Sequence, residues 1–369
     1  MSSTFGKAFR VHTWGESHGL SVGALVDGCP AGIEITREEI QADLDRRRPG
    51  QSAVTTPRGE PDSVEILSGV FEDKTLGTPI GLIVYNKDAD SSKYESLRNK
   101  PRPGHADYTW MKKFGHYDWR GGGRASARET VGRVAAGVVA KKLLAQLDIR
   151  IVAYTVRIGP VTCDSPDPFD ENLPGIIESN SVRTANLEVA GHMEQAILDA
   201  KNDEDSVGGV IEVVATGVPP GLGEPVFDKL DAAISHALMS IPATKGVEIG
   251  AGFPLSEVRG SQSNDIWSVN EDGDMETMTN NAGGILGGIS NGMPIVARLG
   301  FKPPSSIARS QETVDLSTMK KTDIEIKGRH DPCVLPRAVP IIECMMALVL
   351  ADHALLQSLL PRSLANSGS

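Results

Sequence analysis

The stretch 126–147 predicts an apolar helix more clearly than any other part of the chain. It opens with Ser126-x-x-Glu129, a pattern in which the two side chains can cap the first backbone N–H groups of a helix. Aliphatic residues then recur at helical spacing from Val131 to Val139. Such a helix has to pack its apolar face against other elements of the fold.

Three more helices and six strands are expected around it. Thr36-x-x-Glu39 opens a helix that reaches Arg47, and the spacing of apolar residues predicts helices over 224–239 and 337–360. Dense β-branched and aliphatic residues predict strands over 20–26, 63–67, 80–84, 149–158, 207–216 and 294–299. Several strands follow one another without an intervening helix, which indicates antiparallel pairing and an α+β fold with helices packed against sheets.

The chain shows no fixed repeat, low-complexity tract or interdomain linker, so we expect one catalytic domain over 1–362 and a disordered tail over 363–369. Its 369 residues, 40% of them hydrophobic, exclude a disordered or fibrous protein. The segment 1–9 has no long apolar run, and no other segment approaches the roughly 20 apolar residues of a membrane helix. We therefore expect a cytoplasmic protein that does not enter a membrane.

Composition also narrows the possible partners. Cys29, Cys163, Cys333 and Cys344 are scattered without a C-x-x-C pair, so neither a metal site nor a disulfide framework is indicated. A formal net charge of −11 disfavours binding to nucleic acid. Arginines are nevertheless clustered at 46–48 and over 102–133, which favours a small phosphate or carboxylate ligand, although surface ion pairs are the plainer explanation for any single arginine.

The segment 15–19, Gly-Glu-Ser-His-Gly, is the first to indicate chemistry. A serine nucleophile is disfavoured, because neighbouring residues rarely point the same way and the G-x-S-x-G elbow is absent. The flanking glycines allow close approach of a ligand, and an imidazole can act as an acid near neutral pH.

A second region joins Arg-Pro-Gly-His-Ala-Asp at 102–107 to a triple glycine that leads into the capped helix at Ser126. A helix N-terminus preceded by glycines favours anions, and arginines flank it. A tight turn with Ser126 acting only as a cap remains an alternative.

Two further regions are rich in glycine, proline and charge. The segments 241–250, 280–288 and 302–307 do not fit G-x-G-x-x-G and lie in no strand-helix-strand unit, which disfavours a Rossmann site. The segment 328–333 resembles a held loop ahead of the last helix, for which functional and structural interpretations are equally good.

Taken together, the segments 15–19, 102–107, 120–130, 221–227 and 328–333 closely resemble the chorismate synthase family, in the same order. The resemblance implies a single-domain β-α-β sandwich, with a helical layer between antiparallel sheets, usually assembled as a homotetramer. It implies a lyase that removes phosphate from 5-enolpyruvylshikimate 3-phosphate to give chorismate. It also implies reduced FMN as the cofactor, and we expect an external reductant because no reductase domain is visible.

Roles follow from the resemblance by motif. The catalytic groups would be His18 as an acid at the leaving phosphate, His105 and Asp331 at the N1 and N5 sides of the flavin, and Ser17 and Ser126 as relays. Substrate anions would be held by Arg47, Arg48, Arg102 and Arg133. FMN would be held by Arg124, Ala125, Ser126, Pro242, Ala243, Gly287, Lys302, Pro303, Pro304, Ser305, Ser306 and Arg329.

Three positions depart from the family pattern. Ala125 stands where serine is common and Pro304 where threonine is common, so side-chain hydrogen bonds to FMN are lost there. Ala53 stands where many members carry an arginine associated with substrate or nicotinamide nucleotide, and Arg58 is only a neighbour in sequence.

Two other functions compete with the lyase. A paralogue could keep the FMN cradle without chemistry, although His18, His105 and Asp331 argue against it. A phosphate-ester hydrolase or transferase could use the arginines without flavin, but it leaves the segment 302–306 unexplained.

Overall fold

The first part of the chain forms a five-stranded antiparallel sheet, here called the N-terminal sheet. The computed structural model describes residues 3–52, 54–55, 60–87, 95, 97–326, 330–361 and 363–364. Along β3, Val22, Ala24 and Val26 are buried while Leu25 is exposed, because successive residues of a strand face opposite sides. In spatial order the strands are β1 (Thr4–Phe5), β2 (Arg10–Gly15), β3 (Ser21–Asp27), β8 (Ile80–Tyr85) and β5 (Val64–Ser68), and a smaller sheet contains β4 (Ala31–Glu34), β7 (Lys74–Leu76) and β6 (Val70–Phe71).

A second five-stranded antiparallel sheet, the C-terminal sheet, is formed by strands between residues 150 and 301. Its central strand β11 pairs with β9 on one side and β17 on the other, which buries most of β11. The order is β10 (Val161–Thr162), β9 (Arg150–Ile158), β11 (Gly209–Thr216), β17 (Ile295–Phe301) and β12 (Thr244–Ile249).

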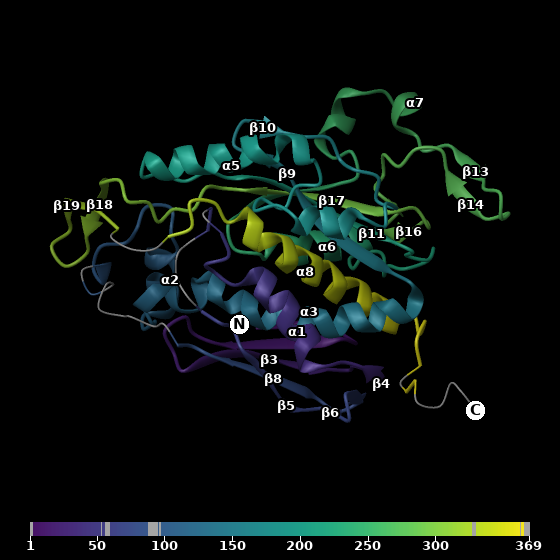
Figure 1. Ribbon diagram of the computed structural model, residues 1–369, viewed down its shortest axis with the longest axis horizontal. Coiled ribbons are helices and arrows are strands. Elements are labelled where there is room, and N and C mark those ends of the chain that lie inside the picture. The colour runs from purple at the N-terminus through teal and green to yellow at the C-terminus, as the bar shows by residue number, and fades with distance from the viewer. Residues whose placement is uncertain are drawn as a thin grey trace.

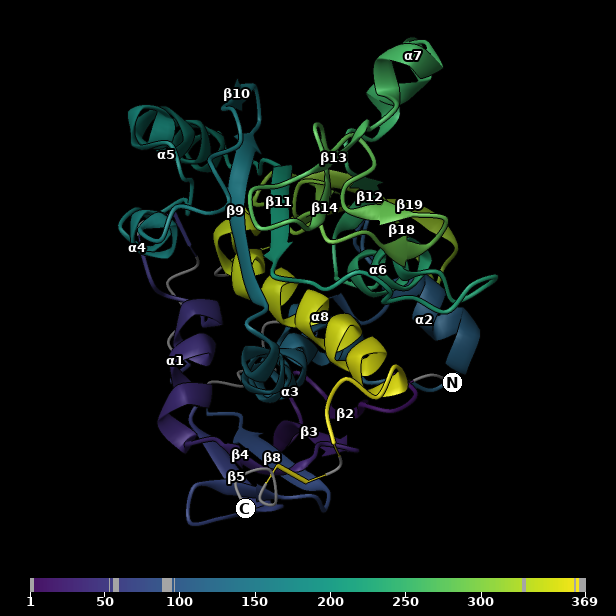
Figure 2. The same ribbon diagram turned by 90° about the vertical axis from the view of Figure 1, so that its right-hand side faces the viewer.

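A layer of helices lies between the two sheets (Figures 1 and 2). Helix α3 packs on the N-terminal sheet, α8 packs on β9 and β11 of the C-terminal sheet, and the two helices pack on each other. The layer consists of α1 (Arg37–Arg47), α3 (Thr130–Leu144), α6 (Leu230–Met239) and α8 (Leu335–Leu356). The expected sandwich, with helices between antiparallel sheets, is confirmed.

The two central helices approach closely at a glycine. A Cβ atom added to Gly137 of α3 would lie 2.2 Å from Cβ of Cys344 in α8, far inside van der Waals contact. Glycine weakens an isolated helix. Here it allows the two helix backbones to come together.

Helix α8 contains a proline whose missing hydrogen bond is replaced. Pro340 has no N–H, so the carbonyl of Pro336 loses its partner within the helix. The guanidinium of Arg183 donates to that carbonyl instead, and Arg183 is itself held by Glu178. The helix therefore continues through Pro340.

The apolar length of α8 corrects one sequence expectation. Helix α8 has 22 residues, and an 18-residue window within it has a mean hydropathy of 1.8, so it is long and apolar enough to cross a membrane by length and composition alone. However, 89% of that window is buried inside the protein, so α8 is the central core helix of the fold.

The predicted elements are largely confirmed, with different ends. All six predicted strands exist, with each end within two residues of the expectation. The helix expected from residue 224 starts only at Leu230, because 224–228 forms a loop closed by a bridge between Glu224 and Asp228. The last helix begins at Leu335 and ends at Leu356 rather than at residue 360.

Helix α3 begins differently from the expected capping box. Ser126 caps a short 3₁₀ turn, Ala127–Glu129, by accepting from the backbone N–H of Arg128. The Glu129 carboxylate pairs with Arg133 one turn later instead of reaching back. The box predicted at Thr36 and Glu39 is present at the start of α1.

The remaining elements lie outside these layers. They are α2 (Asp107–Phe114), α4 (Leu173–Glu178), α5 (Leu187–Asn202), α7 (Gly260–Ser263), and the hairpins β13 (Trp267–Val269) with β14 (Met275–Thr277), β15 (Ile285–Leu286) with β16 (Ile289–Ser290), and β18 (Gln311–Asp315) with β19 (Lys320–Ile324). Near the end of the chain, Ser363 pairs with Ala31 and the N–H of Leu364 donates to the Ala31 carbonyl, so these two residues contact the fold. Residues 365–369 of the expected tail lie outside the described part.

A buried ionic cluster joins the helices of the central layer. Glu343 of α8 is only 4% exposed, and its Oε2 lies 2.7 Å from Nη1 of Arg46 in α1 and 2.8 Å from Nζ of Lys141 in α3. Asp43 also pairs with both cations. Burial alone would raise the pKa of Glu343, but Arg46 and Lys141 outweigh it and hold that pKa well below its usual range.

We expect Glu343→Gln to lower the free energy of unfolding by about 3 kcal/mol at neutral pH, because it removes the buried carboxylate shared by Arg46 and Lys141 and leaves Asp43 to balance both cations. Denaturant unfolding checks this. The difference from wild type should shrink as the pH falls below about 4.3, since a carboxylate with a lowered pKa contributes stability above its unfolded value and loses it in acid.

The matched control is Asp27→Asn, which removes a carboxylate from an exposed pair with Arg10. That change should alter stability by about 1 kcal/mol or less. Equal losses in the two variants would contradict a special contribution from the buried cluster.

Candidate active site

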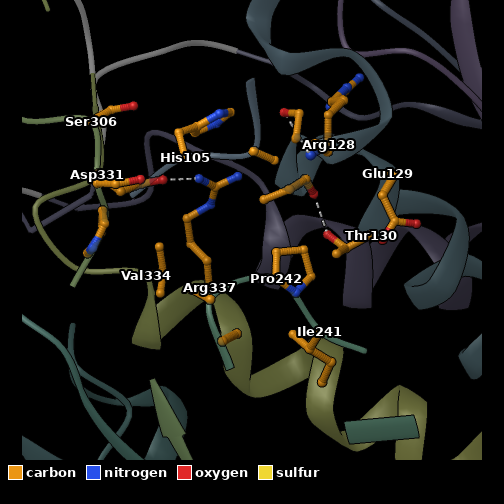
Figure 3. A pocket seen from close by; sticks show the side chains of 18 of the residues that line it. His105, Arg128, Glu129, Thr130, Ile241, Pro242, Ser306, Asp331, Val334 and Arg337 are labelled. Carbon is orange, nitrogen blue, oxygen red and sulfur yellow. Dashed lines mark hydrogen bonds and ion pairs between the residues drawn. The ribbon is translucent and has the colours of Figure 1, made fainter. Parts of the chain in front are cut away.

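A cavity of about 600 Å³ opens at one end of the helical layer, where loops from distant parts of the chain meet (Figure 3). In Figure 3, Asp331 and Arg337 lie on the same side as His105 and Ser306, opposite Arg128 to Thr130. The cavity size is typical of small-molecule sites. Among the described residues, seven cationic side chains line it: Arg47, Arg102, Arg124, Arg128, Arg133, Lys302 and Arg337. Three carboxylates line it: Glu60, Glu129 and Asp331.

The triple glycine forms a tight turn that packs against His18. Gly121, Gly122 and Gly123 all have positive φ, a conformation that favours glycine. A Cβ atom on Gly121 would lie 2.1 Å from Cε1 of His18, so the loop can meet the imidazole only without a side chain. Gly121 lines the cavity, and His18 lies directly behind it. His18 is only 9% exposed.

Ser17 and His18 are fixed to this turn. The N–H of Ser17 donates to the carbonyl of Gly123, and Oγ of Ser17 lies 3.1 Å from Nδ1 of His18. Asn86 holds the same loop by donating to the carbonyls of Glu16 and Gly19. These contacts with the glycine turn and with Asn86 therefore fix the positions of Ser17 and His18, which the residue types alone could not determine.

Arg124 connects the glycine turn with the N-terminal sheet. Its guanidinium donates to the carbonyl of Gly15 and to Oγ1 of Thr13. Ala125 and Ser126 follow it along the cavity wall. The hydroxyl of Ser126 accepts from the N–H of Arg128 and retains its own hydrogen for a ligand.

On the opposite wall, Arg102, His105 and Asp107 form one compact group. Nε and Nη2 of Arg102 each lie 2.8 Å from an oxygen of Asp107, and Nδ1 of His105 lies 2.7 Å from Oδ1 of the same carboxylate. Burial raises the pKa of Asp107, but Arg102 and His105 outweigh that and hold it well below its usual range. The carboxylate is therefore ionised.

The substrate arginine predicted at 47 is almost fully buried. Nη1 of Arg47 lies 3.1 Å from Asp62, and Arg128 pairs with the other oxygen of the same carboxylate. Burial lowers the pKa of Arg47 to about 9, which leaves it cationic at neutral pH. Nε of Arg47 and Nη2 of Arg128 have no hydrogen-bond partner among the described residues.

Arg133 lies where α3 faces the segment after α6. Its guanidinium contacts Glu129 at 2.7 Å and Oγ of Ser240 at 2.6 Å. Pro242 and Ala243 follow Ser240 along the wall, and the carbonyl of Ala243 accepts from the N–H of Lys302.

The loop after β17 packs on the segment around His105. Nζ of Lys302 donates to the carbonyl of Gly104, and Nη1 of Arg102 lies 3.3 Å from Oγ of Ser306. Burial, followed by the nearby Lys245, lowers the pKa of Lys302. Pro304 and Ser305 also line the cavity.

Not every predicted residue lies at this cavity. Arg48 is half-exposed beside Asp45 at the end of α1, Pro303 is not among the lining residues, and Gly287 occupies an exposed turn between β15 and β16. Arg329, Ala53 and Arg58 lie outside the described residues.

The cavity also contains residues that the motif comparison did not assign. Arg337 pairs closely with Asp331 and donates to the carbonyl of Arg47, and Glu60 lies 3.9 Å from Arg128. His330 lines the wall with its Nε2 buried and without a partner among the described residues, and burial, then Arg102, lowers its pKa. The motif 328–333 contains His330 and Asp331 but gave His330 no role, and no sequence pattern singled out Arg337 or Glu60.

Comparison with known proteins agrees with this arrangement. A family model described as chorismate synthase matches residues 9–355. A protein named chorismate synthase from Methanococcoides burtonii is 55% identical over 351 residues, covering 95% of each chain. One from Chloroflexus aurantiacus is 56% identical over 357 residues, covering 97% of this chain and 96% of its own.

Comparison of the fold with solved structures identifies the same family. A crystal structure of chorismate synthase matches with a TM-score of 0.76 at 34% identity, covering 95% of this chain and 93% of the other. Because the family model and these relatives span nearly all of the sequence, the chain belongs to the chorismate synthase family.

Proposed function

We propose that the chain converts 5-enolpyruvylshikimate 3-phosphate to chorismate by a 1,4-elimination, with loss of the C3 phosphate and a C6 hydrogen. The observation that carries this proposal is the excess of cations around one cavity, where the described part of the chain supplies seven cationic side chains against three carboxylates. Such an excess suits a small ligand with several negative charges. The substrate carries two carboxylates and a phosphate.

Arg47, Arg48, Arg102 and Arg133 are the proposed anchors for these anions. Nε of Arg47 is a buried donor without a partner among the described residues, so an anion oxygen can satisfy it. Arg102 and Arg133 are held in place by Asp107 and Glu129, which limits their motion before substrate binds. Arg48 could reach the cavity only by moving from its place beside Asp45.

The family is flavin-dependent, and we propose reduced FMN as the cofactor. The residues present fit an anionic, planar ligand, because Arg124, Ser126 and Lys302 offer donors beside the apolar walls of Ala125, Pro242 and Ala243. When bound, reduced flavin supplies the electron that promotes C–O cleavage, which simple base catalysis at an unacidified C–H cannot do. Pro303, Pro304, Ser305 and Ser306 complete the proposed cradle, with Gly287 and Arg329 as further contacts.

The proton-handling groups lie on two sides of the glycine turn. His18 is proposed as the acid at the leaving phosphate, with Ser17 bonded to its Nδ1. His105 is proposed at the N1 side of the flavin and Asp331 at the N5 side, with Ser126 as a relay. Positioned acid and base groups of this kind contribute about 10² to 10⁴ in rate.

We further propose a single catalytic domain over 1–362, a homotetramer, a cytoplasmic location and an external flavin reductant. Gly287 lies on an exposed turn away from the cavity of its own chain, which suits a contact with a neighbouring subunit. No role in binding nucleic acid or membranes is proposed.

The decisive experiment is anaerobic conversion of 5-enolpyruvylshikimate 3-phosphate, with and without chemically reduced FMN, followed by the ultraviolet absorbance of chorismate. We expect chorismate only with reduced FMN. Phosphate release that is unchanged without flavin would favour a hydrolase or transferase. A folded, FMN-binding protein that makes no chorismate would favour an inactive paralogue.

We expect His105→Ala to lower kcat by about 10² to 10⁴, because it removes a positioned acid-base group from the cavity wall. Circular dichroism and thermal unfolding should match wild type, since His105 is partly exposed. Near-wild-type turnover, or loss of activity through unfolding alone, would contradict its proposed role.

We expect Ala125→Ser to bind FMN equally well or more tightly, because a hydroxyl is added to the wall beside Ser126. A flavin fluorescence titration measures this directly. Markedly weaker binding would be inconsistent with the proposed position of FMN.

A further inference from the structure

We propose that Asp107 is a positioning residue that fixes the hydrogen of neutral His105 on Nδ1, so that Nε2 is the nitrogen presented to the ligand. This inference rests on the proposed function for its consequence in turnover. Its structural content, the tautomer of His105, can be tested without any turnover.

The distances determine where the ring hydrogen lies. Nδ1 of His105 is 2.7 Å from Oδ1 of Asp107 and 3.0 Å from Nη2 of Arg102. An unprotonated nitrogen that close to an ionised carboxylate oxygen would place two lone pairs against each other. Nδ1 must therefore carry the hydrogen and donate it to Asp107, and the contact with Arg102 is not a second hydrogen bond to that nitrogen.

Arg102 holds the carboxylate that orients the ring. Its Nε and Nη2 each lie 2.8 Å from one carboxylate oxygen, and its backbone N–H donates to Oδ2 at 3.0 Å. The side chain of Arg102 is only 5% exposed, so its paired contacts with Asp107 are shielded from solvent. Because these contacts favour the ionised form, Asp107 orients His105 without taking its proton.

The other edge of the ring faces the glycine turn. A Cβ atom at Gly122 would lie 3.1 Å from Cε1 and 3.5 Å from Nε2 of His105, so the turn limits the ring on that side. Among the described residues, the polar contacts of the His105 ring are all at Nδ1, which leaves Nε2 without a protein partner there, and His105 lines the cavity. In neutral His105 this leaves a lone pair on Nε2, so Nε2 is the nitrogen that accepts a proton from a ligand or returns one to it.

The surroundings also predict what an amide at 107 would do. Oδ2 accepts from two N–H groups of Arg102, whereas Oδ1 faces one N–H of Arg102 and the imidazole. In Asp107→Asn the amide nitrogen avoids the position with two donors and takes the place of Oδ1. There it donates to Nδ1, which moves the ring hydrogen to Nε2.

The test is ¹⁵N NMR of histidine-labelled protein, at a pH high enough that the ring signals no longer change. The chain has eight histidines, and the His105 signals are assigned by their loss in His105→Ala. We expect hydrogen on Nδ1 in wild type and in Asp107→Glu, and on Nε2 in Asp107→Asn. Hydrogen on Nε2 in wild type, or an unchanged tautomer in Asp107→Asn, would overturn the proposal.

Kinetics then test the consequence. We expect Asp107→Asn to lower kcat by about 10² to 10⁴, Asp107→Glu to recover much of that loss, and Asp27→Asn to match wild type. A changed tautomer with wild-type kcat would overturn the positioning role. If wild type itself makes no chorismate, the proposed function fails while the NMR result still decides the tautomer.

Thermal unfolding shows whether each Asp107 variant folds, and so separates a loss of positioning from a loss of stability. If Asp107→Asn does not fold, Asp107→Glu carries the test, because it keeps the charge that Arg102 needs and moves it by one methylene group. A folded Asp107→Glu protein with hydrogen on Nε2 would also overturn the proposal.

Discussion

The pairing of arginines with buried carboxylates is the interaction on which the site depends. Cations gathered around one cavity repel one another and lose hydration on burial. Asp62 lies between Arg47 and Arg128, Asp107 holds Arg102, and Asp331 holds Arg337. These carboxylates let the fold place guanidinium groups side by side before a ligand arrives. An excess of positive charge remains for an anionic ligand.

The helical layer holds these ion pairs in fixed positions relative to one another. Helix α3 carries Arg133 and α8 carries Arg337 to the cavity, while the contact at Gly137 sets the distance between the two helices. The buried cluster around Glu343 joins the same helices to α1, which ends at Arg47. A site built on packed helices is held more precisely than one built on loops alone. The loops then supply the histidines and the glycine turn.

Sequence patterns predicted the elements better than their ends. Strands with dense aliphatic residues were found, whereas β2 was missed because its exposed positions include Arg10 and His12. Helix α5 was missed although Asn186 caps it, since it lies on the outer side of the C-terminal sheet and buries only Met193 and Ile197. The motifs contained Arg128 and His330 but gave them no role, and Arg337 lay outside the motifs; Arg128 and Arg337 contact Asp62 and Arg47, which lie far along the chain.

The sequence by itself determined the class of fold, the family and most of the chemically active residue types, because periodicity and motifs are local properties of a chain. Only the tertiary structure decided which groups meet. His18 packs directly behind Gly121 of the cavity wall because Gly121 has no side chain, and Arg47 shares Asp62 with Arg128 across 81 positions of sequence. Burial, charge pairing and the choice of ring nitrogen in His105 depend on distances between segments, which no local pattern records.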